Sequence, residues 1–263
     1  MEKSKLNCII LEKGGFEMYK KSIKILLSCF FIFASIIFSS NVSNAADKKS
    51  DTEKISKEHL EKFGKLKMNS TIEEVAKIIY GKKYKEKLKK ENGITVFKKK
   101  ELVKGIGSST VYYYSFFTEK VVWNKTIVDK MIINLSTKKN GKTLYLTGKI
   151  YAVPSKTKNE TGVRESEKYL ENNKVIKKNM STKDLDKILA GKGLGNWSSV
   201  DYSDFSKTGI YSDESKKLVF PKPSKSKHYQ FRTKNKKTVW QVSLIYNEKK
   251  KDYVVEDCYV ISI

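Results

Sequence analysis

Histidine is scarce in this chain, which limits the chemistry that its side chains can carry out. Its 263 residues include only His59 and His228, and neither has cysteine or acidic neighbours at the spacing of a metal site. We interpret both as surface histidines. The adjacent carboxylates Glu73 and Glu74 point to different sides of a helix, so they cannot serve as acid and base on one substrate. The sequence therefore predicts no catalytic residues, no metal ligands and no cofactor, and a protein that is not an enzyme.

Arginine is equally rare, although the chain is strongly basic. Arg164 and Arg232 are the only arginines among 54 basic residues, which face 29 acidic ones and give a formal net charge of +25. Lysine is a flexible point charge that suits diffuse attraction better than bidentate readout of phosphates or bases. We therefore expect no nucleic-acid partner. Two interpretations of the charge remain open: AT-rich coding, which favours lysine codons, or attraction to polyanions outside the cell, such as wall teichoic acids.

One long apolar run lies near the N-terminus. Residues 25–38 are mostly apolar, follow a lysine-rich segment, and precede Ser43-Asn-Ala45, a small-x-small cleavage site. This pattern predicts a signal peptide over residues 1–45 and export of the chain. The expected start is Met18, because the codons for Lys13-Gly14-Gly15 can form a ribosome-binding sequence. The alternative, a retained membrane anchor, normally requires a longer apolar run.

Removal of residues 1–45 changes the cysteine count and the charge. Cys8 and Cys29 lie in the removed segment, so we expect no intramolecular disulfide and stability from packed cores alone. The loss of six lysines and three glutamates leaves a net charge of +22. We expect a monomer, free of membrane contact after cleavage, that is secreted or associated with the cell wall of a Gram-positive bacterium.

The remaining sequence contains two similar helix starts. Thr71 is followed three positions later by Glu74, and Ser181 is followed at the same spacing by Asp184. A hydroxyl residue and a carboxylate at this spacing can cap each other's backbone amides, which is typical of the first turn of a helix. Apolar residues then recur at helical spacing in both segments.

Equivalent positions in the two segments are separated by a nearly constant distance along the chain. Gly81 and Gly191, which end the expected helices, are 110 residues apart, and Met131 and Trp240 in the expected strands are 109 apart. A period of this length indicates two domains, since solenoid repeats are much shorter.

We therefore predict an α+β fold: a tandem duplication of a unit with two helices and a four-stranded antiparallel sheet, preceded by the signal peptide. The parts are a charged leader (46–57), a first unit (58–153), a linker (154–166) and a second unit (167–263). The expected helices are 59–65, 71–80, 167–172 and 181–190. The expected strands are 95–103, 109–117, 129–136, 142–153, 197–202, 228–233, 238–246 and 252–263, and a long loop spans 203–227.

Alternation along the strands predicts which side chains face the helices. This set is Met131, Ile133, Leu135, Leu144, Leu146 and Ile150 in the first unit and Trp240, Val242, Leu244, Tyr253, Val255, Tyr259 and Ile261 in the second. The opposite face would carry Tyr113, Phe117, Ile132, Asn134, Tyr145, Thr147 and Tyr151, then Gln230, Arg232, Gln241, Ser243, Glu256 and Cys258.

The aromatic residues on the opposite face suggest a binding surface, since exposed aromatic patches rimmed by polar groups are typical of interfaces. The predicted partner-binding residues are Tyr113, Phe117, Tyr145, Tyr151, Arg232 and Gln241. The alternatives are that this face packs on the other unit, or that the alternation slips by one residue within residues 111–117.

Two motifs carry a resemblance to a known family. Met68-Asn-Ser-Thr71-Ile-Glu-Glu-Val75 and Asn179-Met-Ser181-Thr-Lys-Asp-Leu185 each open a short helix that ends in glycine, in two tandem units. In this arrangement residues 58–263 resemble the beta-lactamase inhibitory protein family, whose helical motif also occurs in outer-membrane assembly lipoproteins of the SmpA/OmlA type. The resemblance implies two sheets side by side that form a concave aromatic surface and grip a protein partner.

The sequence thus predicts a secreted, non-enzymatic protein that binds an extracellular protein partner, as an inhibitor if the resemblance extends to activity. The alternative function is that of a cationic protein that binds cell-envelope polyanions through its lysines.

Overall fold

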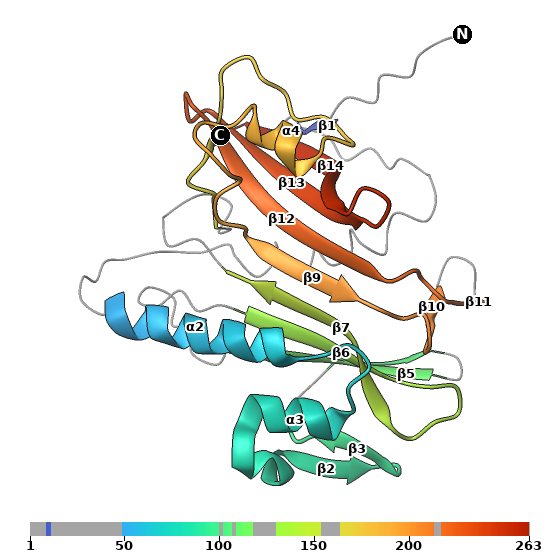
Figure 1. The fold of residues 1–263 in the computed structure, drawn as a ribbon. Coiled ribbons are helices and arrows are strands. Elements are labelled where there is room, and N and C mark those ends of the chain that lie inside the picture. Colours follow the sequence, from blue (N-terminus) through green and yellow to red (C-terminus); the bar gives the residue numbers. More distant parts are fainter. Residues whose placement is uncertain are drawn as a thin grey trace.

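A ten-stranded, mostly antiparallel sheet is the main element of the fold (Figure 1). The computed structural model describes residues 9–11, 49–99, 102–106, 109–117, 130–153, 164–212 and 217–262. Along the sheet the strands follow the order β1-β14-β13-β12-β9-β7-β6-β5-β4, with β8 paired to β12. The predicted α+β class agrees with this combination of one large sheet and few helices.

The bounds of the elements are as follows. The helices are α2 (Lys49–Lys65), α3 (Ile72–Tyr80), the 3-10 helix η1 (Gly81–Lys87) and α4 (Thr182–Asp186). The strands up to residue 153 are β1 (Ile9–Leu11), β2 (Leu88–Glu91), β3 (Ile94–Phe97), β4 (Leu102–Ile106), β5 (Ser109–Phe116), β6 (Lys130–Thr137) and β7 (Leu144–Ala152). The later strands are β8 (Tyr169–Leu170), β9 (Ser199–Ser203), β10 (Ile210–Ser212), β11 (Lys217–Val219), β12 (Ser224–Thr233), β13 (Thr238–Asn247) and β14 (Asp252–Ser262).

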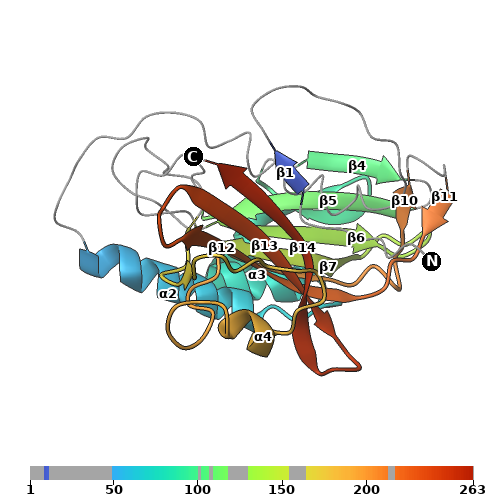
Figure 2. The same ribbon diagram turned by 90° about the horizontal axis from the view of Figure 1, so that it is seen from above.

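The helices α2, α3 and α4 lie on one side of the sheet, as the view from above shows (Figure 2). We call this the helix side, and the opposite surface the helix-free face. Helix α3 buries one stripe of its surface, with Val75 and Ala76 completely inaccessible, because apolar residues recur on that side at helical spacing. Its apolar stripe packs on Met131, Ile133 and Leu135 of β6 in a first core. A second core forms around Leu185 of α4, Phe231 and Trp240.

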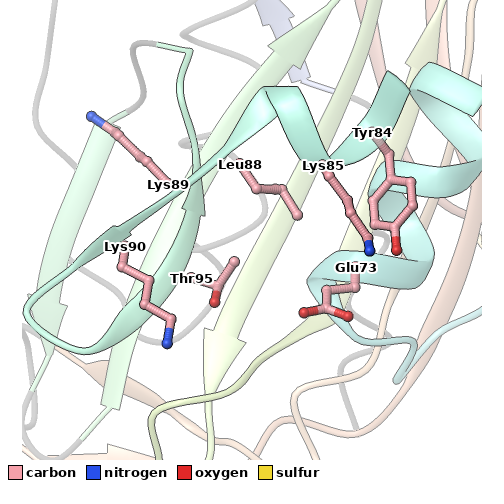
Figure 3. Close-up of a pocket in the computed structure, with 7 residues that line it drawn as sticks. All are labelled: Glu73, Tyr84, Lys85, Leu88, Lys89, Lys90 and Thr95. Carbon is pink, nitrogen blue, oxygen red and sulfur yellow. The ribbon is translucent and has the colours of Figure 1, made fainter. Parts of the chain in front are cut away.

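A small hairpin of β2 and β3 lies beside α3 and η1, outside the main sheet. It borders a cavity of about 260 Å³ (Figure 3). The lining residues are Glu73, Tyr84, Lys85, Leu88, Lys89, Lys90 and Thr95. In Figure 3 Lys85 extends toward Glu73 and Tyr84, so the protein's own opposite charges already face each other there. The cavity lies below the usual range of about 300 to 1,000 Å³ for ligand pockets.

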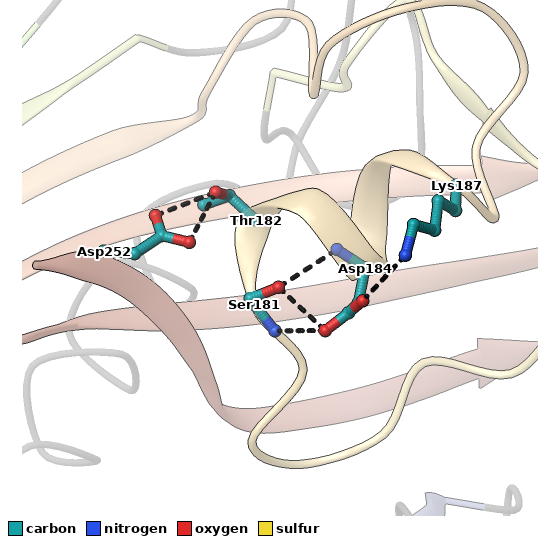
Figure 4. A network of polar contacts seen from close by, with 5 residues as sticks. All are labelled: Ser181, Thr182, Asp184, Lys187 and Asp252. Carbon is teal, nitrogen blue, oxygen red and sulfur yellow. Dashed lines mark hydrogen bonds and ion pairs between the residues drawn. The ribbon is translucent and has the colours of Figure 1, made fainter. Parts of the chain in front are cut away.

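Both predicted capping boxes are present. In the first unit the Thr71 hydroxyl accepts from the Glu74 amide at 3.4 Å, and the Glu74 carboxylate accepts from the Thr71 amide at 2.7 Å. In the second unit the corresponding distances between Ser181 and Asp184 are 3.1 and 3.4 Å (Figure 4). The Ser181 hydroxyl also donates to the Asp184 carboxylate, and this hydrogen bond is the main reason why the pKa of Asp184 is lowered.

Removal of these caps should destabilise the protein measurably. We expect Ser181→Ala and Thr71→Ala each to lower the free energy of unfolding by about 0.5 to 2 kcal/mol, because the Asp184 or Glu74 amide of the first turn loses its hydroxyl acceptor. Chemical denaturation monitored by circular dichroism checks this. Thr95→Ala, on the β2–β3 hairpin and outside both caps, is the control. Unchanged midpoints in both cap variants would mean that the caps contribute nothing to stability.

The segments before the two capped helices make the same contacts with their sheets. Asn69 and Asn179 both adopt the left-handed conformation, with φ of 66° and 67°. The Asn69 amide donates to the Leu146 carbonyl at 2.8 Å, and the Asn179 amide donates to the Val255 carbonyl at 2.7 Å. These contacts are separated along the chain by the same offsets as the sequence repeat.

A β-bulge in the first unit reverses the expected alternation of faces. Asn134 pairs with Gly148 whereas Leu135 pairs with Leu146, so Thr147 is the extra, unpaired residue of the bulge in β7. Beyond the bulge Tyr151 points to the helix side, where it is 1% exposed in the first core. The predicted position of Tyr151 on the opposite face is therefore wrong, and so is that of Ile150 among the helix-facing residues.

The second unit contains a bulge at the equivalent place. Ser243 pairs with Asp257 whereas Leu244 pairs with Val255, which leaves Glu256 as the extra residue of β14. Cys258 consequently lies in the second core, and the expectation that Tyr259 and Ile261 face the helices is wrong. Cys258 is disulfide-bonded in the full chain. The expectation of no disulfide concerned the chain after removal of residues 1–45 and stays a prediction; Cys8 and Cys29 lie outside the described residues.

Several predicted elements differ from those observed. The predicted helix 167–172 is replaced by β8, and α4 ends at Asp186 although its pattern continues to residue 190. The reason is pairing with β8: the Ala190 amide donates to the Tyr169 carbonyl at 2.8 Å, and this takes the chain out of the helix.

Three other predicted segments also differ. The leader is helical from Lys49 onward. The predicted strand 95–103 is divided between β3 and β4, and the loop 203–227 contains β10, β11 and the start of β12.

The two units form one continuous sheet. Strand β9 of the second unit pairs with β12 and also with β7 of the first, over five residue pairs from Gly148–Ser203 to Ala152–Ser199. Trp197 packs against both cores. The linker is described only from residue 164 onward. Within the described residues, no helix is long and apolar enough to cross a membrane.

Candidate binding face

Two of the predicted aromatic residues lie on the helix-free face. Tyr113 in β5 lies between Tyr112 and Tyr114, which both pack in the first core, so its own side chain points the other way. Tyr145 in β7 is likewise flanked by two buried leucines. Both tyrosines are half-buried, and burial raises the pKa of Tyr113. The Lys138 ammonium lies 4.6 Å from the centre of the Tyr145 ring.

Phe117 lies elsewhere. It follows the last residue of β5 with φ of 69°, a left-handed conformation that takes its side chain out of the strand's alternation. Its ring is stacked on His59 of α2, with 3.6 Å between the ring centres and an angle of 5° between the planes. The prediction that Phe117 lies on the opposite face is therefore wrong, and His59 is half-buried in this stack.

The two predicted polar residues of the second unit are on the helix-free face, and both are half-buried. Arg232 forms a two-pronged ion pair with Glu165, at 2.6 Å from Nη2 to Oε1 and 3.0 Å from Nε to Oε2. It also donates to the Lys236 carbonyl at 3.1 Å. A guanidinium held by three such bonds is a structural anchor. Gln241 is half-buried and pairs with Gln230, which is completely buried.

A polar row that the sequence analysis did not identify crosses the middle of this face. His228 is 8% exposed, with its Nδ1 atom 3.0 Å from the Ser243 hydroxyl and its Nε2 atom 3.4 Å from the Ser226 hydroxyl. Burial lowers the pKa of His228 to about 4, so the imidazole is neutral at pH 7. The prediction of a surface histidine is wrong here. The sequence did contain a signal for this row: every second residue of β12 from Ser224 to Arg232 is polar, so these side chains share one face of the strand.

Asp201 lies on the neighbouring strand β9, directly opposite Ser226. Burial raises the pKa of Asp201 to about 7. Serine, histidine and aspartate thus meet on one face, but both ring nitrogens of His228 already face serine hydroxyls. In a catalytic triad one of these nitrogens is held by the acid. The row is therefore a buried network of polar side chains and does not have the arrangement of a catalytic triad. No cluster of three or more metal-binding side chains occurs among the described residues.

The helix-free face thus belongs to one continuous sheet, with half-buried tyrosines at Tyr113 and Tyr145 and buried polar side chains across its centre. No family model, curated protein or solved structure matches the chain. The fold and the side chains of this face are the basis for a functional proposal.

Proposed function

We propose that this chain is a secreted, non-enzymatic protein that holds a protein partner on its helix-free face. The observation that carries the proposal is the pairing of β7 with β9, which makes this face continuous across both units. The face has aromatic anchors in the first unit and polar groups in the second. Interfaces commonly combine a few aromatic residues that bind strongly with a polar surround.

The proposal includes the origin of the two units by tandem duplication. It is supported by the two capping boxes, by the left-handed Asn69 and Asn179, and by the bulges at equivalent places. Local features of this kind do not depend on the general class of the fold, so their joint recurrence at offsets of 109 and 110 favours a common origin.

The resemblance to the beta-lactamase inhibitory protein family gives the proposal a specific form. Two sheets side by side, which that resemblance implies, are consistent with the joined sheet. Inhibition of a beta-lactamase by the purified protein is the direct assay. If the partner is not a beta-lactamase, it should be recovered by using the purified protein to capture partners from culture supernatant and cell-wall extracts.

Tyr145 is the residue of choice for testing the face. Tyr145→Ala should weaken partner binding by about 1 to 4 kcal/mol if the ring is a central anchor. The thermal midpoint should change little, because the ring is half-buried and outside both cores. Isothermal titration calorimetry and thermal unfolding measure the two effects separately.

The matched control is Tyr84→Ala, which removes a half-buried tyrosine of η1 on the helix side. It should leave partner affinity unchanged. Equal affinity of the Tyr145 variant and the unchanged protein, or a selective loss in the Tyr84 variant, would contradict the assignment of the binding face.

A second candidate function, binding of cell-envelope polyanions, is favoured by the net charge of +25. A salt titration distinguishes the two. Binding to a polyanion should weaken steeply as salt rises, because the counterions released on binding then gain less entropy, whereas binding through aromatic anchors should depend little on salt.

A further inference from the structure

A cluster of tyrosines lies on the helix side of the sheet, at the place where the two units meet. Tyr202, Tyr229, Tyr246 and Tyr253 come from the neighbouring strands β9, β12, β13 and β14. The rings of Tyr246 and Tyr253 are 5.2 Å apart at an angle of 70°. Burial raises the pKa of Tyr253 to about 12, and contacts with the other tyrosines, including a hydrogen bond to Tyr202, add to this shift. Its hydroxyl is therefore a stable hydrogen-bond donor at physiological pH.

Lysines accompany these tyrosines. The Lys225 ammonium is 5.4 Å from the centre of the Tyr246 ring, and the Lys227 ammonium is 4.8 Å from that of Tyr253. Both lysines lie on β12 at alternate positions before Tyr229, which packs in the second core, so they share its side of the sheet. We call these six residues the tyrosine–lysine cluster.

The short length of α4 leaves this cluster partly uncovered. The helix spans only five residues, and its first residue, Thr182, contacts Asp252 at the start of β14. In Figure 1 the ends of β9 and β12 nearest β10 lie beyond both α2 and α4. Tyr202, Tyr246 and Tyr253 are half-buried and Lys225 is exposed, so rings, hydroxyls and ammonium groups are all accessible there.

The local charge is positive. The turn that joins β13 and β14 next to the cluster contains three lysines, Lys249, Lys250 and Lys251, and one carboxylate, Glu248. Among the nearby carboxylates, Asp252 accepts the Thr182 hydroxyl, and Asp201 lies on the opposite face of the sheet. The cluster is therefore complementary in charge to an anion.

We propose that the tyrosine–lysine cluster binds a polymer of polyols joined by phosphodiester groups. This inference rests on the second candidate function and assigns it a site. Lysine ammonium groups are point charges suited to phosphate oxygens, and tyrosine hydroxyls can exchange hydrogen bonds with the polyol hydroxyls between them. The edge-to-face arrangement of Tyr246 and Tyr253 lacks the parallel ring faces on which successive bases of single-stranded nucleic acid would stack.

The test uses purified full-length protein and three probes: poly(glycerol phosphate), a single-stranded oligothymidylate and neutral dextran. We expect binding of poly(glycerol phosphate) that is tighter than binding of the oligothymidylate, and no binding of dextran. Equal or tighter binding of the oligothymidylate would overturn the polyol specificity. Failure of poly(glycerol phosphate) to bind would overturn both the site and the second candidate function.

Variants then separate the site from general charge. K225Q/K227Q should weaken poly(glycerol phosphate) binding about tenfold. K82Q/K83Q, which removes the same charge from exposed lysines of η1, should weaken it by less than about threefold. Equal losses in the two variants would overturn the site while leaving polyanion binding itself intact. Y246F/Y253F keeps both rings and removes their hydroxyls, and it should weaken binding as well. Unchanged affinity would contradict the proposed hydrogen bonds between these hydroxyls and the polyol.

Discussion

Replacement of Trp240 by alanine should lower the free energy of unfolding by about 3 to 5 kcal/mol. Trp240 is 8% exposed and lies opposite Phe231 in the middle of the second core. Truncation of a buried ring removes its burial from water and leaves a cavity that its neighbours fill only in part. A loss of this size is a large fraction of the stability of a typical domain.

The joined sheet makes the unfolding behaviour of this variant informative. Because β7 and β9 share hydrogen bonds and Trp197 packs in both cores, we expect one cooperative transition at a lower midpoint. Urea denaturation monitored by circular dichroism measures both the midpoint and the number of transitions. Phe220→Ala, which truncates a 57% exposed ring, is the control and should change stability by less than about 0.5 kcal/mol. Two separate transitions would show that the units unfold independently.

Replacement of Lys149 by methionine should have the next largest effect, about 2 to 4 kcal/mol, since two buried acceptors lose their donor. Its ammonium donates to the carbonyls of Phe63 and Leu66, both at 2.7 Å, at the C-terminal end of α2. It also lies 4.3 Å from the Phe63 ring centre and 5.2 Å from that of Tyr202. Methionine preserves most of the packing volume, so the measured loss reports the polar contacts.

The effect of Lys149 should also depend on pH. Burial lowers the pKa of Lys149 from 10.5 to about 8, so between these values the unfolded chain holds a proton that the folded chain has released. The contribution of Lys149 to stability is therefore largest above pH 10.5 and is lost as the pH falls through about 8. We expect the difference in unfolding free energy between the unchanged protein and Lys149→Met to grow from pH 8 to 10. A constant difference would mean that the two carbonyl contacts offset the effect of burial on this pKa.

The matched control for this experiment is Lys139→Met. Lys139 is exposed in the turn between β6 and β7. Its replacement should leave both the midpoint and its pH dependence nearly unchanged. A similar loss in both variants would point to the general charge of the protein and not to the contacts of Lys149.

Features set by neighbouring residues could be predicted from the sequence. The hydroxyl and carboxylate pairs at Thr71 and Ser181 identified both helix starts, because capping depends on residues only three positions apart. Strands β5, β6, β7, β13 and β14 agree with the expected ranges to within two residues, since apolar alternation is a local property of each strand.

The tertiary structure decided which side chains form the candidate sites. Tyr151 and Cys258 face the cores because a bulge in each unit shifts the alternation by one residue, and a bulge exists only relative to the partner strand. The helix at Ser181 is short because its last turn is exchanged for contacts with β8. The tyrosine–lysine cluster combines residues of four strands that become neighbours only when β9 joins the two units. The sequence by itself therefore determined the local elements and their order, whereas strand pairing determined the faces, because pairing depends on contacts between residues far apart along the chain.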